Sequence, residues 1–241
     1  MSILNAYDKV KQRQMGVTAV IVAAGSSRRM GTDKLFMDLA GVPVLVRTLL
    51  QFEQCPQVDE IIVVTREDKL TEVADYCKSF GITKCGKVVL GGKERAESSA
   101  AGVMQADRHS GYIAISDGAR PLITPALITK TIEAAKKYGA AAPAVPVKDT
   151  IKTAENGVVT GTPDRSKLYA IQTPQVFEAD IIKGALTKAI RDKLSITDDC
   201  SAVEALGYPV HLVDGDYENI KITTMEDLYV SQAFLAARGN R

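Results

Sequence analysis

This chain is organised around the segment Val17-Thr-Ala-Val-Ile-Val-Ala-Ala-Gly-Ser-Ser-Arg-Arg-Met-Gly-Thr-Asp-Lys-Leu-Phe36. It begins as an apolar run from Val17 to Ala24 and breaks at Gly25. A strand that is covered by helices on both faces has no polar side, so its sequence does not alternate between polar and apolar residues. The run therefore predicts a buried strand of a parallel sheet.

The loop after this strand is basic and begins with small residues. In open α/β sheets, ligands bind at the carboxyl ends of the strands. Gly25 allows the backbone N–H groups to approach an anion closely, and Arg28, Arg29 and Lys34 add positive charge. The pattern matches neither the P-loop nor the dinucleotide fingerprint. It predicts a phosphate-binding loop, and the alternative is a turn that leads into a solvated basic helix.

Length and composition limit the possible classes of protein. The chain has 241 residues, of which 46% are hydrophobic and 24% charged, which predicts one α/β domain over residues 1–241 with a short extension at 1–15. A net charge of +1 argues against a general nucleic-acid binder. No apolar run approaches the roughly 20 residues of a membrane span. Residues 1–15 lack the apolar core of a secretory signal, so we expect a cytoplasmic protein.

Cysteine and histidine are too sparse to form a familiar metal or catalytic site. The cysteines, Cys55, Cys77, Cys85 and Cys200, show no Cys-x-x-Cys spacing, which favours reduced thiols over a zinc site or a disulfide framework. With only two histidines, a catalytic triad based on histidine is poorly supported.

Strand-like and helix-like segments alternate along the chain. The predicted strands are Val17–Ala24, Glu60–Thr65, Lys87–Leu90, Tyr112–Ser116, Ala140–Val147 and Pro209–Val213. The predicted helices are Val44–Gln54, Asp68–Phe80, a segment from Pro125 to Tyr138 that Thr124 caps, and Cys200–Leu206. This alternation is typical of βαβ units, so we predict an α/β fold with a Rossmann-like, doubly wound, mostly parallel sheet.

Residues 148–172 depart from this alternation. Asn156-Gly157 is a strong hairpin signal between two β-prone segments. A hairpin this polar buries little of itself, so we predict that it projects from the domain and packs against a second copy of the chain. The alternative is a solvated surface loop.

Two clusters of residues with possible chemistry follow predicted strands. In Gly91-Gly-Lys-Glu-Arg-Ala-Glu-Ser98, the glycines permit a close approach to a ligand, and Ser98 either caps the next helix or bonds the ligand. In Ser116-Asp-Gly-Ala-Arg-Pro121, Asp117 is a natural ligand for Mg²⁺, which proteins hold with one or two carboxylates plus substrate phosphates. Arg120 either binds another phosphate or pairs with Asp117.

Two further polar clusters lie near the end of the chain. Asp198 and Asp199 form either a second acidic site or, with Thr197 or Asp198 as the N-cap, the start of a short helix. Lys221 comes just before a Thr-x-x-Asp start to the terminal helix.

These segments, in this order, resemble the 2-C-methyl-D-erythritol 4-phosphate cytidylyltransferases of non-mevalonate isoprenoid biosynthesis. The resemblance extends over nearly all of the chain beyond residue 16. The matching segments are Ala23-Ala-Gly-Ser-Ser-Arg-Arg-Met-Gly31, Gly91–Ser98, Asp117–Pro121, Pro146-Val-Lys-Asp-Thr150, Gln172-Thr-Pro-Gln-Val-Phe177, Thr197-Asp-Asp-Cys-Ser-Ala-Val-Glu204 and Asn219-Ile-Lys-Ile-Thr223.

The resemblance implies transfer of CMP from CTP to methylerythritol phosphate, with Mg²⁺ as cofactor, by a homodimer whose β-hairpin arms reach toward the neighbouring sites. It also implies a role for each matching residue. Those implied to bind CTP are Ala23, Ala24, Gly25, Gly91, Ser98 and Asp117, with Asp117 also at the metal. Those implied to be catalytic are Arg29, Lys34, Arg165 and Lys221. Those implied to bind the acceptor are Arg120, Thr150, Thr173 and Thr197.

Two rival functions stay open at the level of the sequence. A cytidylyltransferase for ribitol 5-phosphate would share the fold and the CTP site, and only the acceptor pocket and the arm would differ. A non-catalytic nucleotide-binding module is the rival from another class. The presence of Arg29, Lys34, Asp117 and Lys221 together weighs against that module.

Overall fold

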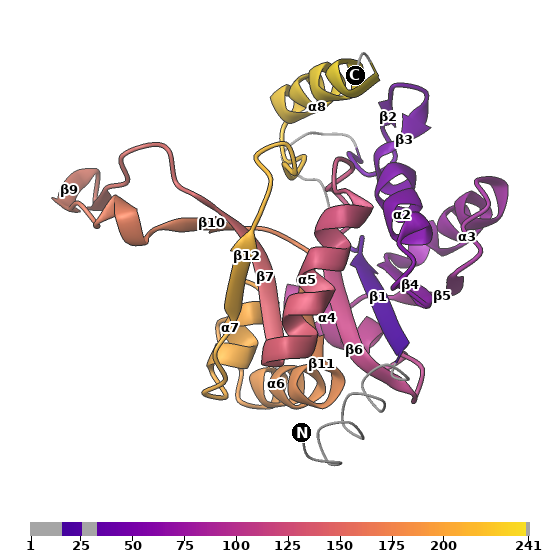
Figure 1. Ribbon diagram of the computed structural model, residues 1–241, viewed down its shortest axis with the longest axis horizontal. Helices are drawn as coiled ribbons and strands as arrows, with labels where there is room; N and C mark the ends of the chain where they lie inside the picture. The colour runs from indigo at the N-terminus through magenta and orange to yellow at the C-terminus, as the bar shows by residue number, and fades with distance from the viewer. Residues whose placement is uncertain (1–15, 26–32, 240–241) are drawn as a thin grey trace, which may run out of the picture.

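The computed structural model describes residues 16–25 and 33–239 (Figure 1). The strands are β1 (Gly16–Val22), β2 (Asp38–Leu39), β3 (Val42–Pro43), β4 (Glu60–Thr65), β5 (Cys85–Leu90), β6 (Ser110–Asp117), β7 (Ala140–Pro146), β8 (Thr153–Glu155), β9 (Val158–Gly161), β10 (Tyr169–Ile171), β11 (Gln175–Glu178) and β12 (His211–Asp214). The helices are α2 (Val44–Gln54), α3 (Leu70–Ser79), α4 (Arg95–Val103), α5 (Pro125–Tyr138), α6 (Ala179–Arg191), α7 (Asp199–Glu204) and α8 (Met225–Gly239), with short 3₁₀ turns η1 (Glu67–Lys69) and η2 (Arg165–Lys167).

One eight-stranded sheet forms the centre of the fold. Its strands follow the order β10-β7-β11-β6-β1-β4-β5, and β12 pairs with β7. The pairs of β1 with β4 and β6, of β4 with β5 and of β12 with β7 are parallel, whereas β11 and β10 run antiparallel to their neighbours. The sheet is therefore mixed but mostly parallel, which confirms the predicted α/β class.

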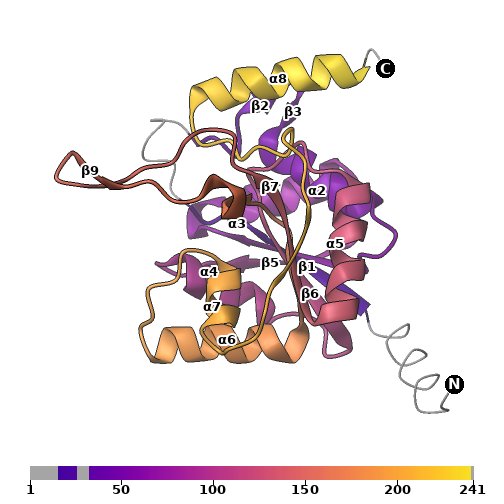
Figure 2. The same cartoon turned by 60° about the vertical axis from the view of Figure 1, so that its left-hand side comes forward.

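Helices cover both faces of the sheet, and β1 contributes to two hydrophobic cores. Val17, Ala19 and Ile21 pack with α2, α3 and α5, whereas Val20 packs with α4, α6 and α7. Figure 2 shows α6 and α7 on the opposite side of the sheet from α2 and α8. A strand that is buried on both faces must be apolar at successive positions, which explains the apolar run that begins at Val17 in β1.

Local signals in the sequence locate the predicted elements to within two residues. β4 and α2 have the predicted bounds, and α5 begins after Thr124, whose hydroxyl accepts a hydrogen bond from the Leu127 N–H. The other predicted strands and helices differ from the structure by one or two residues at one or both ends. Among them, β1 ends at Val22, α3 starts at Leu70 after a 3₁₀ turn, and α7 covers Asp199–Glu204.

The segment with Asn156-Gly157 contains a two-stranded antiparallel sheet of β8 and β9. Asn156 and Gly157 take φ angles of 49° and 80°, the left-handed conformation that this turn requires. Figure 1 shows this segment extending away from the central sheet. The predicted excursion is too long at its end, because Tyr169–Ile171 forms β10 and pairs with β7. A role in dimerisation stays a prediction.

Two other expectations concern the rest of the chain. In the part of the chain that the structure describes, no helix is both long and apolar enough to cross a membrane. The predicted extension at residues 1–15 lies outside the described residues.

Gly102 in α4 allows that helix to pack closely on the sheet. A Cβ at this position would lie 2.4 Å from Val20 Cγ1 and 2.7 Å from Val64 Cγ2. We expect Gly102→Ala to lower the free energy of unfolding by about 1–3 kcal/mol, the usual effect of overpacking a core. Urea denaturation measures this change.

Gly184→Ala in α6 is the matched control, because the nearest heavy atom to its added Cβ is 4.0 Å away. We expect this control to raise stability by about 0.5–1 kcal/mol, since alanine is the better helix former. Equal effects of the two substitutions would contradict the proposed packing.

Candidate active site

A cavity of about 360 Å³ opens at the carboxyl ends of β1 and β6, where α/β sheets bind their ligands. The residues that line it are Val22, Ala24, Gly25, Lys34, Leu35, Gly92, Lys93, Glu94, Arg95, Ser98, Asp117, Ala119 and Lys221. Predicted site residues from four separate segments thus surround one space.

Backbone hydrogen bonds hold the walls of this cavity in place. The Ala23 N–H donates to the Val64 carbonyl at 2.7 Å, and the Gly118 N–H donates to the Val22 carbonyl at 2.9 Å. The first bond continues the strand pairing past the end of β1, and the second continues it past the end of β6. The loops on either side of the cavity are therefore fixed by the sheet itself.

Gly91 has a structural reason to be glycine that the sequence did not reveal. A Cβ at this position would lie 2.5 Å from the Ala24 Cβ and 3.0 Å from the Ser98 Oγ. The prediction assigned this glycine to close approach of a ligand. In the structure, the close approach is between two loops of the protein, and Gly91 is absent from the cavity wall.

Ser98 lies inside α4, so the prediction that it caps the helix was wrong. Glu94 is the N-cap, and its carboxylate and that of Glu97 form a reciprocal capping box with the backbone. The Ser98 hydroxyl lies 3.1 Å from the Glu94 carbonyl and 3.3 Å from the Gly92 carbonyl. Ser98 keeps its place on the cavity wall, which leaves its ligand-binding role as the remaining prediction.

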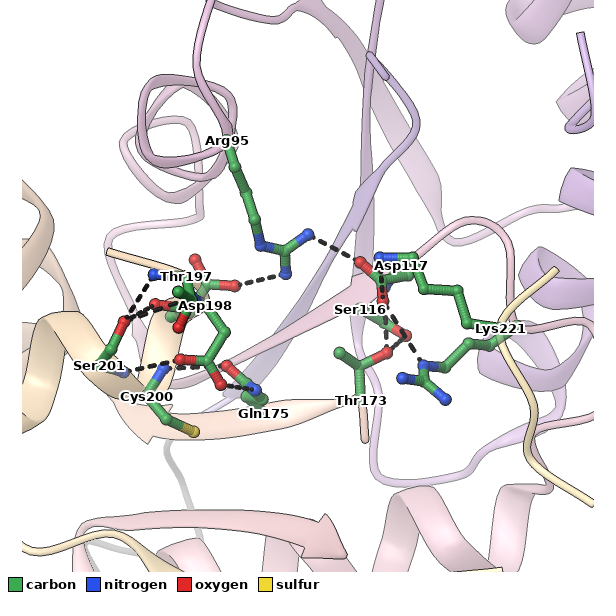
Figure 3. Close-up of polar contacts among 12 residues, drawn as sticks. Arg95, Ser116, Asp117, Thr173, Gln175, Thr197, Asp198, Cys200, Ser201 and Lys221 are labelled. Atoms are coloured by element: carbon green, nitrogen blue, oxygen red, sulfur yellow. Dashed lines mark hydrogen bonds and ion pairs between the residues drawn. The ribbon is translucent and has the colours of Figure 1, made fainter. Parts of the chain in front are cut away.

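Asp117 is buried at the end of β6 and faces three cations. Its carboxylate oxygens lie 2.7 Å from Arg95, 3.1 Å from Lys221 and 3.5 Å from Arg120. Figure 3 shows Arg95 and Lys221 reaching it from opposite sides. Burial would raise the pKa of Asp117, but the charges of Arg95, Lys221 and Arg120 outweigh burial and hold this pKa well below its usual range. Asp117 is therefore ionised at neutral pH.

Arg95, the first residue of α4, was not assigned a role from the sequence. Its guanidinium donates one hydrogen bond to Asp117 at 2.7 Å and another to Asp199 at 2.9 Å. Asp199 is fully buried, and burial raises its pKa although Arg95 opposes that shift. The arginine therefore links β6 to α7, and its bond to Asp199 spans 104 positions of sequence. Only its place beside the glycines of Gly91–Ser98 could have drawn attention to it.

Arg120 is buried and pairs with Asp117, as one of its two predicted alternatives stated. Its Nη1 also donates to the Asn219 carbonyl at 2.6 Å. Burial lowers the pKa of Arg120. Because Arg120 is absent from the cavity wall, the structure favours a role in supporting Asp117 over direct contact with a phosphate.

Lys34, Lys93 and Lys221 line the cavity, and two of them, Lys34 and Lys221, are predicted site residues. Lys221 is placed by the neighbouring Ile222, whose N–H donates to the Ala119 carbonyl at 2.8 Å. Lys34 lines the cavity from the loop after β1. The neighbouring Asp33 forms an ion pair with Arg66, with 2.6 Å between the Asp33 Oδ2 and the Arg66 Nη2. Lys34 and Lys221 thus line one cavity, and their role at the phosphates stays a prediction, whereas Arg28 and Arg29 lie outside the described residues.

The three predicted acceptor-binding threonines, and Arg165, which was predicted to be catalytic, are absent from the cavity wall. Thr150 and Arg165 are exposed on the projecting segment, where the Arg165 Nη1 donates to the Lys148 carbonyl at 2.9 Å. Thr197 is exposed before α7, and Asp198 is the N-cap of that helix. Thr173 is buried beneath the end of β6.

Comparison with known proteins identifies the family. The sequence model of the 2-C-methyl-D-erythritol 4-phosphate cytidylyltransferase family matches residues 17–237. The chain belongs to this family.

Relatives of that name cover almost the whole chain. The protein of this name from Caldanaerobacter subterraneus subsp. tengcongensis is 47% identical over 92% of this chain and 99% of its own length. That of Geotalea uraniireducens is 45% identical, over 92% of this chain and 97% of its own.

Solved structures of the family agree. The 4-diphosphocytidyl-2C-methyl-D-erythritol synthase of Anaerococcus prevotii is 32% identical and matches with a TM-score of 0.84 over 94% of this chain and 99% of its own. The cytidylyltransferase structure from Thermus thermophilus is 31% identical and matches with a TM-score of 0.76 over 91% and 98% of the two chains.

The donor set of the cavity suits a magnesium ion that arrives with a nucleotide. In residues 16–25 and 33–239, no group of three or more histidine, cysteine or acidic side chains forms a metal cage. Magnesium does not need one, since it commonly takes one or two carboxylates and completes its shell with phosphate oxygens and water. Asp117 supplies a hard, ionised oxygen donor at the cavity wall, so the residues present fit this ion.

Thr173 supports Asp117 from below. Its Oγ1 lies 2.9 Å from the Ser116 Oγ and accepts a hydrogen bond from the Asp117 N–H at 3.1 Å. We expect Thr173→Val to lower the free energy of unfolding by about 1–3 kcal/mol, because the buried N–H and hydroxyl lose their partner. Chemical denaturation measures the loss.

Thr173→Ser is the matched variant, because it keeps the hydroxyl and removes only a methyl group. We expect it to retain more stability than the valine variant. If the valine variant is as stable as the serine variant, Thr173 contributes through packing and not through these hydrogen bonds.

Proposed function

We propose that the chain transfers CMP from CTP to the phosphate of 2-C-methyl-D-erythritol 4-phosphate and releases pyrophosphate, with Mg²⁺ as cofactor. Membership of the family and relatives of that name support the reaction. The observation in the structure that carries the proposal is the cavity at the end of β1 and β6, where Lys34 and Lys221 flank the ionised Asp117. All four cysteines are free thiols, which suits the reducing cytoplasm as the place of the reaction.

Positioning and neutralisation of charge account for the chemistry. A phosphate oxygen of the acceptor attacks the α-phosphorus of CTP, and pyrophosphate leaves from the opposite side. Both reactants are anions, so their repulsion is the main obstacle, and Lys34 and Lys221 lower it by holding the phosphates together. The second pKa of a phosphate monoester is about 6, so the attacking oxygen is already ionised at pH 7 and no general base is needed. The absence of histidine from the cavity wall is consistent with this.

Asp117 would hold the magnesium ion together with phosphate oxygens of CTP. When bound, the ion supplies further neutralisation of the triphosphate charge. The protein's part is to keep the Asp117 carboxylate ionised and aimed into the cavity, which its three cations and Thr173 accomplish.

The projecting segment supports a homodimer. Val158 and Val159, both on β9, are 68% and 57% exposed. Apolar side chains that stand free on an extended hairpin gain most by packing against another surface. We therefore infer that two arms exchange and that Thr150 or Arg165 of one chain serves the acceptor site of the other.

Release of pyrophosphate tests the reaction directly. Purified protein is mixed with CTP and Mg²⁺, and with either 2-C-methyl-D-erythritol 4-phosphate or ribitol 5-phosphate. We expect release that depends on the first acceptor. Release only with ribitol 5-phosphate would overturn the acceptor assignment, and no release with either would support a binding module.

Lys34 is the residue of the basic loop that the structure places in the cavity. We expect Lys34→Ala to lower turnover by at least about 100-fold, because one preorganised charge at the reacting phosphates contributes on the order of 3 kcal/mol. Steady-state kinetics with the folded variant measures this. Lys183→Ala, on α6 and away from the cavity, is the control and should retain turnover. Normal turnover of the Lys34 variant would remove this lysine from the mechanism.

Mixed dimers test whether the arms exchange. Arg165→Ala should raise the acceptor KM or lower turnover more than it weakens CTP binding, because a guanidinium binds phosphate through two parallel hydrogen bonds. If sites are shared, dimers of Arg165→Ala with Lys34→Ala contain one site with both residues intact, and activity returns on mixing. Exchange of subunits is monitored with differently tagged chains. No recovery despite exchange would show that each arm serves its own chain.

A further inference from the structure

Asp199 is a buried carboxylate whose charge the mechanism above does not use. It is 0% exposed, and one oxygen lies 2.9 Å from the Arg95 Nη2. Its other oxygen makes no hydrogen bond of standard geometry among the described residues, and the nearby Ser99 side chain adds a weaker stabilisation of the charged form than Arg95 does. An ionised carboxylate is costly to bury without compensation, so Arg95 is the group that makes this position tolerable.

Hydrogen bonds of its two sequence neighbours to Gln175 fix the position of Asp199. The neighbouring Asp198 accepts a hydrogen bond from the Gln175 side chain at 2.7 Å, and the Cys200 N–H donates to the same side chain at 2.9 Å. Figure 3 shows Gln175 beside these two residues. Since Gln175 belongs to β11 of the central sheet, the first turn of α7 has little freedom to move relative to β6.

The single positive charge of Arg95 therefore interacts with two carboxylates, that of Asp199 on α7 and that of Asp117 at the cavity wall. Its planar guanidinium presents separate N–H groups to Asp117 and to Asp199. Asp117 and Asp199 both lie beside Arg95, so the two carboxylates repel each other, and this repulsion offsets part of the attraction between Asp117 and Arg95.

We propose that Asp199 and Arg95 are positioning residues that set how readily Asp117 exchanges its arginine for a divalent cation. The proposal rests on the proposed function, in which Asp117 is the magnesium ligand. Arg95 orients the Asp117 carboxylate while the cavity is empty. Asp199 keeps the net stabilisation of the Arg95–Asp117 ion pair small enough for Mg²⁺ to replace Arg95 at Asp117.

Opposite effects of two substitutions follow from this arrangement. In Asp199→Asn the full charge of Arg95 acts on Asp117, and one negative charge near the metal is lost, so more Mg²⁺ is needed. In Arg95→Gln the cation that competes with Mg²⁺ is lost, so less Mg²⁺ is needed, although Asp117 loses its orientation and turnover falls. A purely structural link between α4 and α7 would weaken the site in the same direction in both variants.

Binding of CTP as a function of free Mg²⁺ tests the proposal without relying on turnover. Calorimetric titrations give the Mg²⁺ concentration at which CTP binding is half-maximally strengthened. We expect this concentration to rise by about threefold or more in Asp199→Asn and to fall by about threefold or more in Arg95→Gln, since unit charges a few ångströms apart interact at least this strongly even at the dielectric constant of water. The Mg²⁺ dependence of pyrophosphate release should shift in the same two directions, with kcat lowered in Arg95→Gln.

Asp75→Asn is the matched control, since it removes one exposed carboxylate from α3 and should leave the Mg²⁺ concentration unchanged. Thermal unfolding establishes that each variant is folded. If Arg95→Gln does not fold because Asp199 is left unpaired, the double variant Arg95→Gln/Asp199→Asn replaces it. The double variant should need less Mg²⁺ than Asp199→Asn alone.

Shifts in the same direction, or no shift in either variant, would overturn the proposal while the proposed function stands. A wild-type protein whose CTP binding does not respond to Mg²⁺ would overturn the magnesium role of Asp117, and this inference with it. The two failures are therefore distinguishable from the wild-type titration alone.

Discussion

The burial of the Asp117 carboxylate is the constraint on which the site depends. An isolated ionised carboxylate is strongly disfavoured away from water, so its position requires nearby cations. Arg95, Arg120 and Lys221 supply them from three segments far apart in the sequence. These ion pairs bring the start of α4, the loop after β6 and the segment before α8 to one edge of the sheet.

The same cluster solves an electrostatic problem of any pocket that receives a triphosphate. Such a pocket must hold several cations close together, and these repel one another while it is empty. Asp117 offsets that repulsion, since two of its three partners, Arg95 and Lys221, line the cavity themselves. A site that works by charge in this way has little need of histidine, and neither His109 nor His211 lies on the cavity wall.

Local patterns in the sequence predicted the sheet, most of its helices and the location of the cavity. Thr124 and Pro125 set the start of α5, and the apolar run from Val17 predicted β1, because caps and burial on both faces leave signals within a few residues. The roles of Gly91 and Ser98 were predicted less well. Gly91 is required by its close approach to Ala24 and not by a ligand. The N-cap of α4 is Glu94 and not Ser98.

The link from Asp117 through Arg95 to Asp199 could not be predicted from the sequence, for a physical reason. Its two hydrogen bonds span 22 and 104 positions, so no period or motif connects the three residues. Asp199 follows the N-cap of α7, and a carboxylate in the first turn of a helix is explained there by the helix dipole alone. What distinguishes it is complete burial opposite an arginine, which is a property of the packed sheet and helices. The sequence left Asp198-Asp199 as either a second acidic site or the capped start of a helix, and the structure divides the pair into the cap, Asp198, and a buried partner of Arg95, Asp199.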